Sequence, residues 1–258
     1  MKFEQPNFEN LPRPKKIFPH EKYRTNEEAH KLLDSGEEKD LYQLIGGLDE
    51  FDGLDKSFAL KYIAENGGPQ LDKFIDRFND LDQEVAEKLI DKHLGLIVIK
   101  NLDSFAGLDR QAVAQKMIEA GQAGLVAEFL DNFPEINRRE LGETLLKDKP
   151  VALIRNLEKF PDVDHRMLVD RLFQEKRGSE VAANVDKLKG ISHQEIAERL
   201  LEKGSDLSLS DNLKKFKGLN QEVFEKLRKA YGWYELAQNL GSFQGLSKEA
   251  LESIKKPQ

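Results

Sequence analysis

Asparagines return at matching intervals along the chain, and their side-chain amides could recognise the backbone of a bound peptide. They are Asn101, Asn156, Asn184, Asn212 and Asn239. Asparagine is a mediocre helix former, so its return within a helical pattern needs a reason. Two interpretations are open. The amides hydrogen-bond a loop or the adjacent copy, or they form a ladder that holds an extended peptide.

A row of carboxylates accompanies the asparagine positions, two residues further along the chain. Its members are Asp49, Asp76, Asp103, Asp131, Glu158 and Asp186, followed by Lys214 and Gly241 in the last copies. These carboxylates could be solvated or bonded to amides of the loop beneath them. Alternatively, they form an acidic edge that attracts a basic peptide or protein, and salt would then weaken binding. Because they lie one copy apart, they are too widely spaced to share a metal ion.

Other candidates for chemistry are weaker. The histidines are His20, His30, His93, His165 and His193, none is at a metal-ligand spacing from another, and none is assigned to a recurring position. We expect surface or capping roles for them.

Gly67-Gly68 lacks the preceding strand and following lysine-serine or lysine-threonine pair of a phosphate loop. Trp233-Tyr234 could mark an aromatic contact site or be buried between the last two copies. We therefore expect no enzyme, no cofactor and no metal.

The elements that position these side chains are copies of one short unit. A large apolar residue returns every 27 or 28 positions, at Phe51, Phe78, Phe105, Phe133, Phe160, Leu188, Phe216 and Phe243. We call it the periodic residue. The asparagines stand four positions before it and the carboxylates two positions before it. Such a period is typical of repeat arrays, in which each copy buries its apolar face against its neighbours.

Each copy begins with signals for a helix. Four positions after the periodic residue stands a residue that can cap a helix N-terminus: Asp55, Asp82, Asp109, Asn137, Asp164, Ser192, Asn220 or Ser247. The aliphatic residue before each cap can pack on an apolar residue four positions after it, which predicts a hydrophobic staple. Ser192 and Glu195 also predict a capping box. We expect a helix A of about 12 residues in every copy.

A second helix is expected to follow in each copy. Gly67, Gly121, Gly204, Gly232, Pro150 and Gly178 are expected to end helix A and to let the chain reverse. Apolar residues seven and three positions before the next periodic residue, such as Val181 and Val185, then form one helical face. This pattern predicts a helix B of about 8 to 10 residues. No segment is predicted to be a strand.

The two ends of the chain depart from the pattern. Residues 1–22 contain Pro6, Pro12, Pro14 and Pro19 and predict an extended tail. Residues 25–47, which open with a capping box at Thr25 and Glu28, predict a degenerate capping unit. Residues 48–258 hold the copies. We therefore expect a single repeat domain over residues 23–258, closed by the last helix A.

Composition narrows the class of protein. The chain has 258 residues, a net charge of −7 and 34% charged residues, which favours solubility and disfavours a nucleic-acid surface. It has no cysteine, no apolar run at its amino terminus and no stretch of 18 apolar residues. We expect a cytoplasmic protein without membrane contact.

In its recurring asparagines, the chain resembles armadillo repeat proteins, which are known for asparagine ladders that grip extended peptides. The likeness covers one residue type in each copy, and armadillo units are longer, with three helices. More broadly, the chain is similar to the superclass of helical-hairpin repeats that includes the HEAT, armadillo and tetratricopeptide families. This resemblance implies a protein or peptide partner held along the inner face of the array.

The first full copy also resembles transcription-activator-like effector repeats, in Leu54-Asp55, Ala59, Ile63 and Asn66-Gly67-Gly68. That resemblance implies a turn that reads DNA bases. Other copies carry different pairs at this turn, for example Lys92-His93 and Gln174-Glu175, and the period is several residues shorter than in that family. Acidic positions near the turns would also repel phosphate.

The sequence thus predicts an all-α protein, an α-solenoid of the right-handed type with about eight copies and an N-terminal capping unit. We expect a non-enzymatic binding or scaffold protein for a protein or peptide partner, and a nucleic-acid-binding helical array is the alternative. The oligomeric state stays open.

Overall fold

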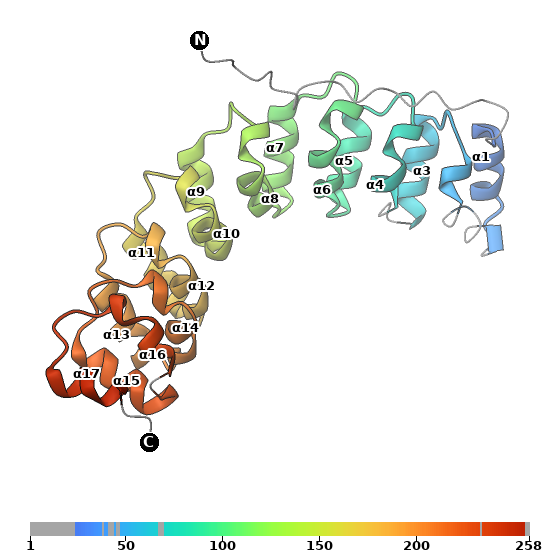
Figure 1. Cartoon of the computed structure of the whole chain (residues 1–258). Helices are drawn as coiled ribbons and strands as arrows, with labels where there is room; N and C mark the ends of the chain where they lie inside the picture. Colours follow the sequence, from blue (N-terminus) through green and yellow to red (C-terminus); the bar gives the residue numbers. More distant parts are fainter. Residues whose placement is uncertain are drawn as a thin grey trace, which may run out of the picture. The chain divides into compact units, whose positions relative to one another are not determined.

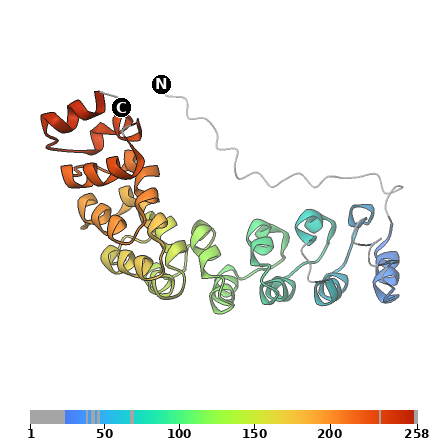
Figure 2. The ribbon, with the colours of Figure 1, turned by 90° about the horizontal axis from the view of Figure 1, so that it is seen from below.

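A computed structural model shows an all-helical chain (Figures 1 and 2). The structure describes residues 24–37, 39–40, 44, 47–66, 70–232 and 234–255. In this part of the chain, extended pairing is limited to isolated β-bridges, such as Leu54 with Phe78 and Leu219 with Phe243. Two compact units are present, a first unit, Met1–Ala120, and a second unit, Gly121–Gln258. We describe each unit by itself.

The longer helices begin where the caps predict. They are α1 (Asn26–Asp34), α3 (Lys56–Asn66), α5 (Gln83–Asp91), α7 (Arg110–Glu119), α9 (Arg138–Asp148), α11 (His165–Gln174), α13 (His193–Glu202), α15 (Gln221–Tyr231) and α17 (Lys248–Lys255). All eight predicted caps accept a hydrogen bond from a backbone N–H of the first turn. Thr25 and Glu28 form both bonds of the predicted capping box. Ser192 accepts from the N–H of Glu195, but the Glu195 carboxylate pairs with Arg166 in the preceding copy.

The second helix of each copy differs from the prediction, because it is divided in two. A short α-helix comes first: α4 (Leu71–Phe74), α6 (Gly95–Lys100), α8 (Ala123–Glu128), α10 (Pro150–Arg155), α12 (Gly178–Ala183), α14 (Asp206–Asp211) and α16 (Tyr234–Gln238). A 3₁₀ turn of three residues follows: η4 (Ile75–Arg77), η5 (Leu102–Ser104), η6 (Leu130–Asn132), η7 (Leu157–Lys159), η8 (Val185–Lys187), η9 (Leu213–Lys215) and η10 (Leu240–Ser242). An equivalent turn, η3 (Leu48–Glu50), precedes the first full copy.

The chain reverses between the two helices through residues in the left-handed region. Gly121 has a φ of +74° and Gly204 a φ of +67°, whereas His93 and Lys176 adopt the same region without being glycine. The expectation that Pro150 and Gly178 end helix A is wrong. Pro150 is the first residue of α10 and Gly178 the first of α12. Proline is well suited to that first position because its missing N–H would have no partner in the helix.

The core consists of the predicted apolar positions. All eight periodic residues are at most 9% exposed. The apolar partner of each hydrophobic staple is also buried in seven of the copies, while Leu251 in α17 is 39% exposed. Leu251 is therefore only partly covered by the described residues.

Helices pack in sequence order inside each unit (Figures 1 and 2). In the first unit, α1 contacts α3, α3 contacts α5, and α5 contacts α6 and α7. In the second unit, α8 contacts α10, α10 contacts α12, and α12 contacts α14, and each of these also contacts a neighbouring helix A. The most extensive contacts therefore join helices of the same copy or of adjacent copies.

Some predictions fall outside the described residues. They concern the tail at residues 1–22, most of the second half of the capping unit, the Gly67-Gly68 pair and Trp233. Among the helices that the structure does describe, none has the length and apolar character needed to cross a bilayer.

Candidate functional site

The five recurring asparagines occupy one structural position, the junction between the short α-helix and the 3₁₀ turn of each copy. Each side-chain Nδ2 donates to the carbonyl oxygen four residues earlier, at distances of 2.9 to 3.0 Å. The pairs are Asn101 with Ile97, Asn156 with Ala152, Asn184 with Glu180, Asn212 with Ser208 and Asn239 with Glu235. Each amide therefore closes the C-terminus of its own helix, where carbonyl groups lack helical partners.

This bond accompanies the division of the second helix in five copies, but it is not required for it, because Phe74 and Phe129 stand at the same division in two others. A side chain that hydrogen-bonds its own helix competes with the regular backbone pattern. At Asn184 the backbone has a φ of −120° and a ψ of 18°, and its N–H donates to Val181, three residues earlier. The α-helix thus stops at the asparagine and the chain tightens into the 3₁₀ turn.

The asparagine amides retain hydrogen-bonding capacity. An amide has two N–H donors and one carbonyl acceptor. One N–H is used inside the helix, and within the described ranges only Asn101 makes a second contact, with Asp72 at 3.2 Å. For Asn156, Asn184, Asn212 and Asn239 the part of the chain that the structure describes supplies no donor to the amide oxygen. We call these four residues of the second unit the amide row.

The carboxylate positions lie at the middle residue of each 3₁₀ turn, and the five whose side chains are described are exposed. Asp103 pairs with Arg110 at 2.9 Å, although its side chain is 95% exposed. Glu158 pairs with Lys187 at 3.2 Å, and hydrogen bonding by its own backbone N–H, helped by Lys187, lowers the pKa of this carboxyl against the effect of burial. Asp76, Asp131 and Asp186 form no ion pair with the described residues. The side chain of Asp49 lies outside the described part.

Three lysines that the sequence interpretation missed join consecutive copies. Each stands one position before the periodic residue. Lys159 donates to the carbonyl of Ala127 at 3.2 Å, Lys187 donates to that of Arg155 at 3.0 Å, and Lys215 donates to that of Ala183. These carbonyls belong to the last turn of the short helix in the preceding copy. A cation there neutralises the negative end of the helix dipole.

Two histidines at the start of helix A also join consecutive copies. They occupy a recurring position, so the expectation that no histidine recurs is wrong. His165 and His193 both stand five positions after a periodic residue. The Nδ1 of His165 accepts from the Lys189 N–H at 2.8 Å, and that of His193 accepts from the Lys217 N–H at 2.9 Å. An accepting nitrogen carries no proton. Burial, with a smaller effect of the adjacent lysine, lowers the pKa of both imidazoles.

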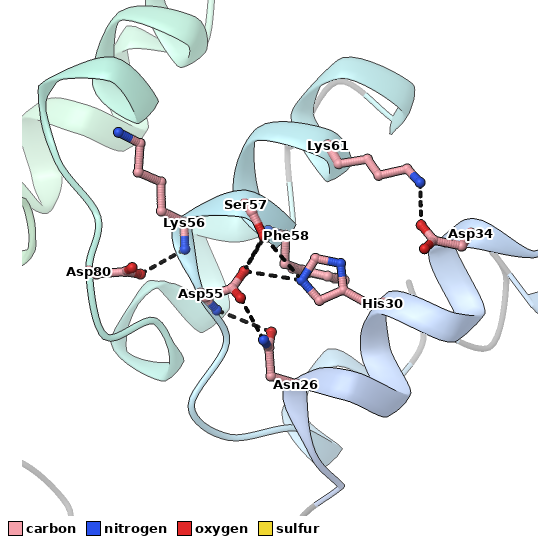
Figure 3. A network of polar contacts seen from close by, with 9 residues as sticks. All are labelled: Asn26, His30, Asp34, Asp55, Lys56, Ser57, Phe58, Lys61 and Asp80. Carbon is pink, nitrogen blue, oxygen red and sulfur yellow. Dashed lines mark hydrogen bonds and ion pairs between the residues drawn. The ribbon is translucent and has the colours of Figure 1, made fainter.

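A polar network at the start of the first unit has the residue types of a catalytic triad but not its geometry (Figure 3). Asp55 caps α3 by accepting from the Phe58 N–H at 2.7 Å, and it also accepts from Asn26 at 2.7 Å and Ser57 at 2.8 Å. Its Oδ1 lies 3.1 Å from the Nε2 of His30, and the Ser57 hydroxyl lies 3.3 Å from the same nitrogen. In a triad, acid and serine bond opposite nitrogens of the ring.

The network therefore caps α3 and joins it to α1. Burial alone would raise the pKa of the Asp55 carboxyl, but the hydrogen bonds outweigh it and hold that pKa well below its usual range. A carboxylate that stays ionised and saturated with donors is suited to holding two helices together and unsuited to moving a proton.

The described residues form no metal centre, and comparison with known proteins finds no match. Among the described residues, no group of three or more His, Asp or Glu side chains is arranged to hold a metal ion. Compared with known proteins, the chain matches no protein-family model, no curated protein and no solved structure.

Proposed function

We propose that this chain is an α-solenoid of eight copies that acts as a non-enzymatic binding protein, and that the amide row holds an extended peptide. The observation that carries the proposal is the shared geometry of Asn156, Asn184, Asn212 and Asn239. Each has one N–H fixed to its own helix, so that the orientation of the remaining N–H and the oxygen is set before a ligand arrives. Preorganised groups bind at a lower entropic cost.

The spacing of the row supports a peptide in extended form. The helices that carry it contact one another in sequence order, as α10 with α12 and α12 with α14. Packed helices lie about 8 to 10 Å apart. An extended chain advances about 3.3 to 3.6 Å per residue, so one copy corresponds to about three peptide residues. Each amide can then meet the same kind of backbone group along the ligand.

A peptide is a better ligand for this surface than a nucleic acid. Exposed Asp131 and Asp186 lie two residues from the asparagine positions of their copies and have no cationic partner within the described part of the chain. Unpaired carboxylates repel phosphate, and nucleic-acid affinity comes largely from lysine and arginine contacts to phosphates. Nucleic acid remains the alternative ligand, and an experiment can decide between the two.

The test compares the full chain with a double variant. Arrayed 12-residue peptides of random sequence select binders, and a 20-nucleotide single-stranded RNA provides the comparison. Changing Asn156→Ala and Asn184→Ala together should weaken the selected peptides about tenfold or more, because each hydrogen bond contributes about 1 kcal/mol.

The control is Asn220→Ala, which makes the same chemical change at a helix A cap, where the Asn220 side chain accepts from the Val223 N–H. It should leave peptide affinity within a factor of two. Equal affinity for the double variant and the original chain, or binding of RNA alone, would contradict the proposal.

A further inference from the structure

The first residue of helix A links its copy to the next one in most of the array. In five copies its side chain bonds to the following copy, from Lys56, Gln83, His165, His193 and Gln221. Arg138, the first residue of α9, is an exception in the second unit, because its side chain bonds to none of the residues that the structure describes. The junction between α9 and α11 therefore has no link from this position.

The other half of the link, a backbone N–H, is missing at the same junction. The residue directly after the periodic residue donates its N–H to the preceding copy at Asn79, Ala106, Lys189, Lys217 and Gln244. Pro161 stands at this position in the copy of α11, and proline has no N–H. Neither side of the α9–α11 junction can therefore form the bond that joins the copies of α11 and α13.

The loop before α11 also differs in its backbone from the loop before α13. In the latter, Gly190 has a φ of +72°, in the left-handed region. Asp162 stands at the equivalent position before α11, and the chain there closes a turn on itself, in which the Val163 N–H donates to the Phe160 carbonyl at 3.3 Å. Proline is favoured at the second position of such a turn. This loop thus satisfies its own backbone and does not bond to the preceding copy.

The remaining connection between α9 and α11 is slight. Among the described residues, the one polar bond from α11 to α9 runs from Arg171 to the Lys147 carbonyl and is long, at 3.4 Å. A hollow of about 570 Å³ lies between α9 and the loop before α11. At the next junction, in contrast, Arg166 of α11 pairs with Glu195 of α13 through two bonds, at 2.6 and 3.1 Å.

The short helices of the same two copies are held together firmly. Lys187 donates to the Arg155 carbonyl at 3.0 Å and pairs with Glu158 at 3.2 Å. The Arg155 guanidinium also pairs with Glu180 of α12, at 2.6 Å. Bonds therefore connect α10 with α12, whereas the helices A beside them have few. A junction that is tied on one side and loose on the other can rotate about the tied side.

We propose that the α9–α11 junction is a hinge inside the second unit. The helix A side opens and closes, and the bonds of Lys187 and Arg155 form the pivot. The spacing of Asn156 and Asn184, which lie close to the pivot in the chain, changes little, whereas the angle between the parts of the second unit before and after the hinge varies. The hinge follows from bonds within the chain and stands whether or not the amide row binds a peptide.

Spin labels on introduced cysteines measure this motion in the full chain by double electron–electron resonance. The hinge pair is Lys147→Cys with Glu202→Cys, which spans the α9–α11 junction. The control pair is Gln174→Cys with Ala230→Cys, which spans the two junctions after it. All four sites are exposed and stand ten positions after a helix A cap. The distance distribution of the hinge pair should be at least about 1.5 times as broad as that of the control pair.

A triple variant introduces the missing link at the hinge. Arg138→His supplies the acceptor, Pro161→Lys supplies the N–H, and Asp162→Gly permits the left-handed backbone that Gly190 has in the next loop. The distribution of the hinge pair should narrow to the width of the control pair. Arg138→His alone is the matched control, because it adds an acceptor without the N–H and should leave the width of the hinge pair unchanged.

The reverse change creates a hinge where the chain has none. Lys189→Pro removes the N–H that His165 accepts and should broaden the control pair. A proline is tolerated there, because the preceding Leu188 is extended, with a ψ of 135°. Lys189→Ala keeps the N–H and should leave the width of the control pair as it is in the original chain.

Equal widths for the two pairs in the original chain would overturn the inference. A hinge pair that stays broad in the triple variant would also overturn it, provided that thermal unfolding shows that this variant is folded. If the triple variant does not fold, the decision comes from Lys189→Pro, and a control pair that this change leaves narrow contradicts the proposal.

Discussion

Single residues in the first turn of helix A reach into the next copy. The Gln83 side chain accepts from the Asp109 N–H at 3.2 Å, and that of Gln221 accepts from the Ser247 N–H at 3.0 Å. His165 and His193 stand at the equivalent position and also accept from a backbone N–H of the next copy. Four copies thus use one position to reach the next copy, but the glutamines accept from the cap residue and the histidines accept from the residue directly after the periodic residue.

We expect His165 and His193 to make the free energy of unfolding depend on pH. The folded protein lowers the pKa of His165 and His193 below the value of about 6.5 that an unfolded chain has. Between the two pKa values, the unfolded state binds more protons. The free energy of unfolding should therefore have its full histidine contribution above about pH 6.5 and lose it as the pH falls towards the folded-state pKa. Urea unfolding at pH 7.5 and pH 5.5 measures the loss.

The double variant His165→Gln and His193→Gln provides the comparison for this prediction. Glutamine at this position accepts from a different backbone N–H of the next copy, that of the cap residue, at Gln83 and Gln221, and it does not titrate. The variant should lose less stability between the two pH values than the original chain. An identical pH dependence in both proteins would show that these imidazoles do not titrate differently on folding.

A periodic residue should be costly to truncate. Phe160 is 2% exposed, and replacing a buried phenylalanine by alanine removes about 3 to 5 kcal/mol of stability. Denaturant unfolding of Phe160→Ala measures this loss. Leu207→Ala, at an exposed apolar residue, should cost below about 0.5 kcal/mol. A loss below about 1 kcal/mol for Phe160→Ala would place the ring outside the core.

The caps and the periodic residues could be predicted because each depends on local sequence. Asp164 needs only its own first turn to act as a cap. The partners of Lys187 and His165 lie 24 to 32 residues away, so their roles depend on how copies face one another. Their recurrence was nevertheless visible, since both occupy repeated positions.

Among the elements, the divided second helix is the one whose form was predicted least well. Apolar positions four residues apart satisfy both a continuous helix and a short helix followed by a 3₁₀ turn, so the pattern could not separate the two. The asparagine marks the break in five copies, whereas Phe74 and Phe129 stand at the same break in two others. Glycines with positive φ two positions after the periodic residue, such as Gly107 and Gly190, were a further regularity that the helix-based interpretation overlooked.

The lysines that join consecutive copies should contribute to the free energy of unfolding. Lys187→Met keeps much of the aliphatic stem but removes the bonds to the Arg155 carbonyl and the Glu158 carboxylate. We expect a loss of about 1 kcal/mol in denaturant unfolding. Lys214→Met is the control, since Lys214 is exposed in the same type of turn and its side chain bonds to none of the residues that the structure describes. Equal losses in both variants would argue against a role for the crossing bond.

At the scale of the whole molecule, the proposed solenoid predicts that distance grows with copy number. The chain contains no cysteine, so spin labels can be placed on introduced cysteines alone. Pairs at Asp131 and Asp186, two copies apart, and at Asp131 and Gly241, four copies apart, lie within the second unit. With about 9 Å per copy, the label distances should be near 18 Å and 36 Å. If the labels at positions 131 and 241 are no further apart than those at positions 131 and 186, this stacking is excluded.

Function was the least predictable property of the molecule, and the reason is physical. An asparagine that caps its own helix and an asparagine that grips a ligand have the same sequence signature, and the structure shows the first use at Asn156 and Asn184.

The most direct measurement of the central claim follows the side-chain amides themselves. In the chain labelled with ¹⁵N at asparagine, a selected peptide should shift the side-chain NH₂ signals of Asn156, Asn184 and Asn212 together, with one affinity. The signals of Asn137 and Asn220, which cap helix A, should stay in place. Saturating peptide that leaves the amide row unmoved, or that shifts only the helix A caps, would contradict the account.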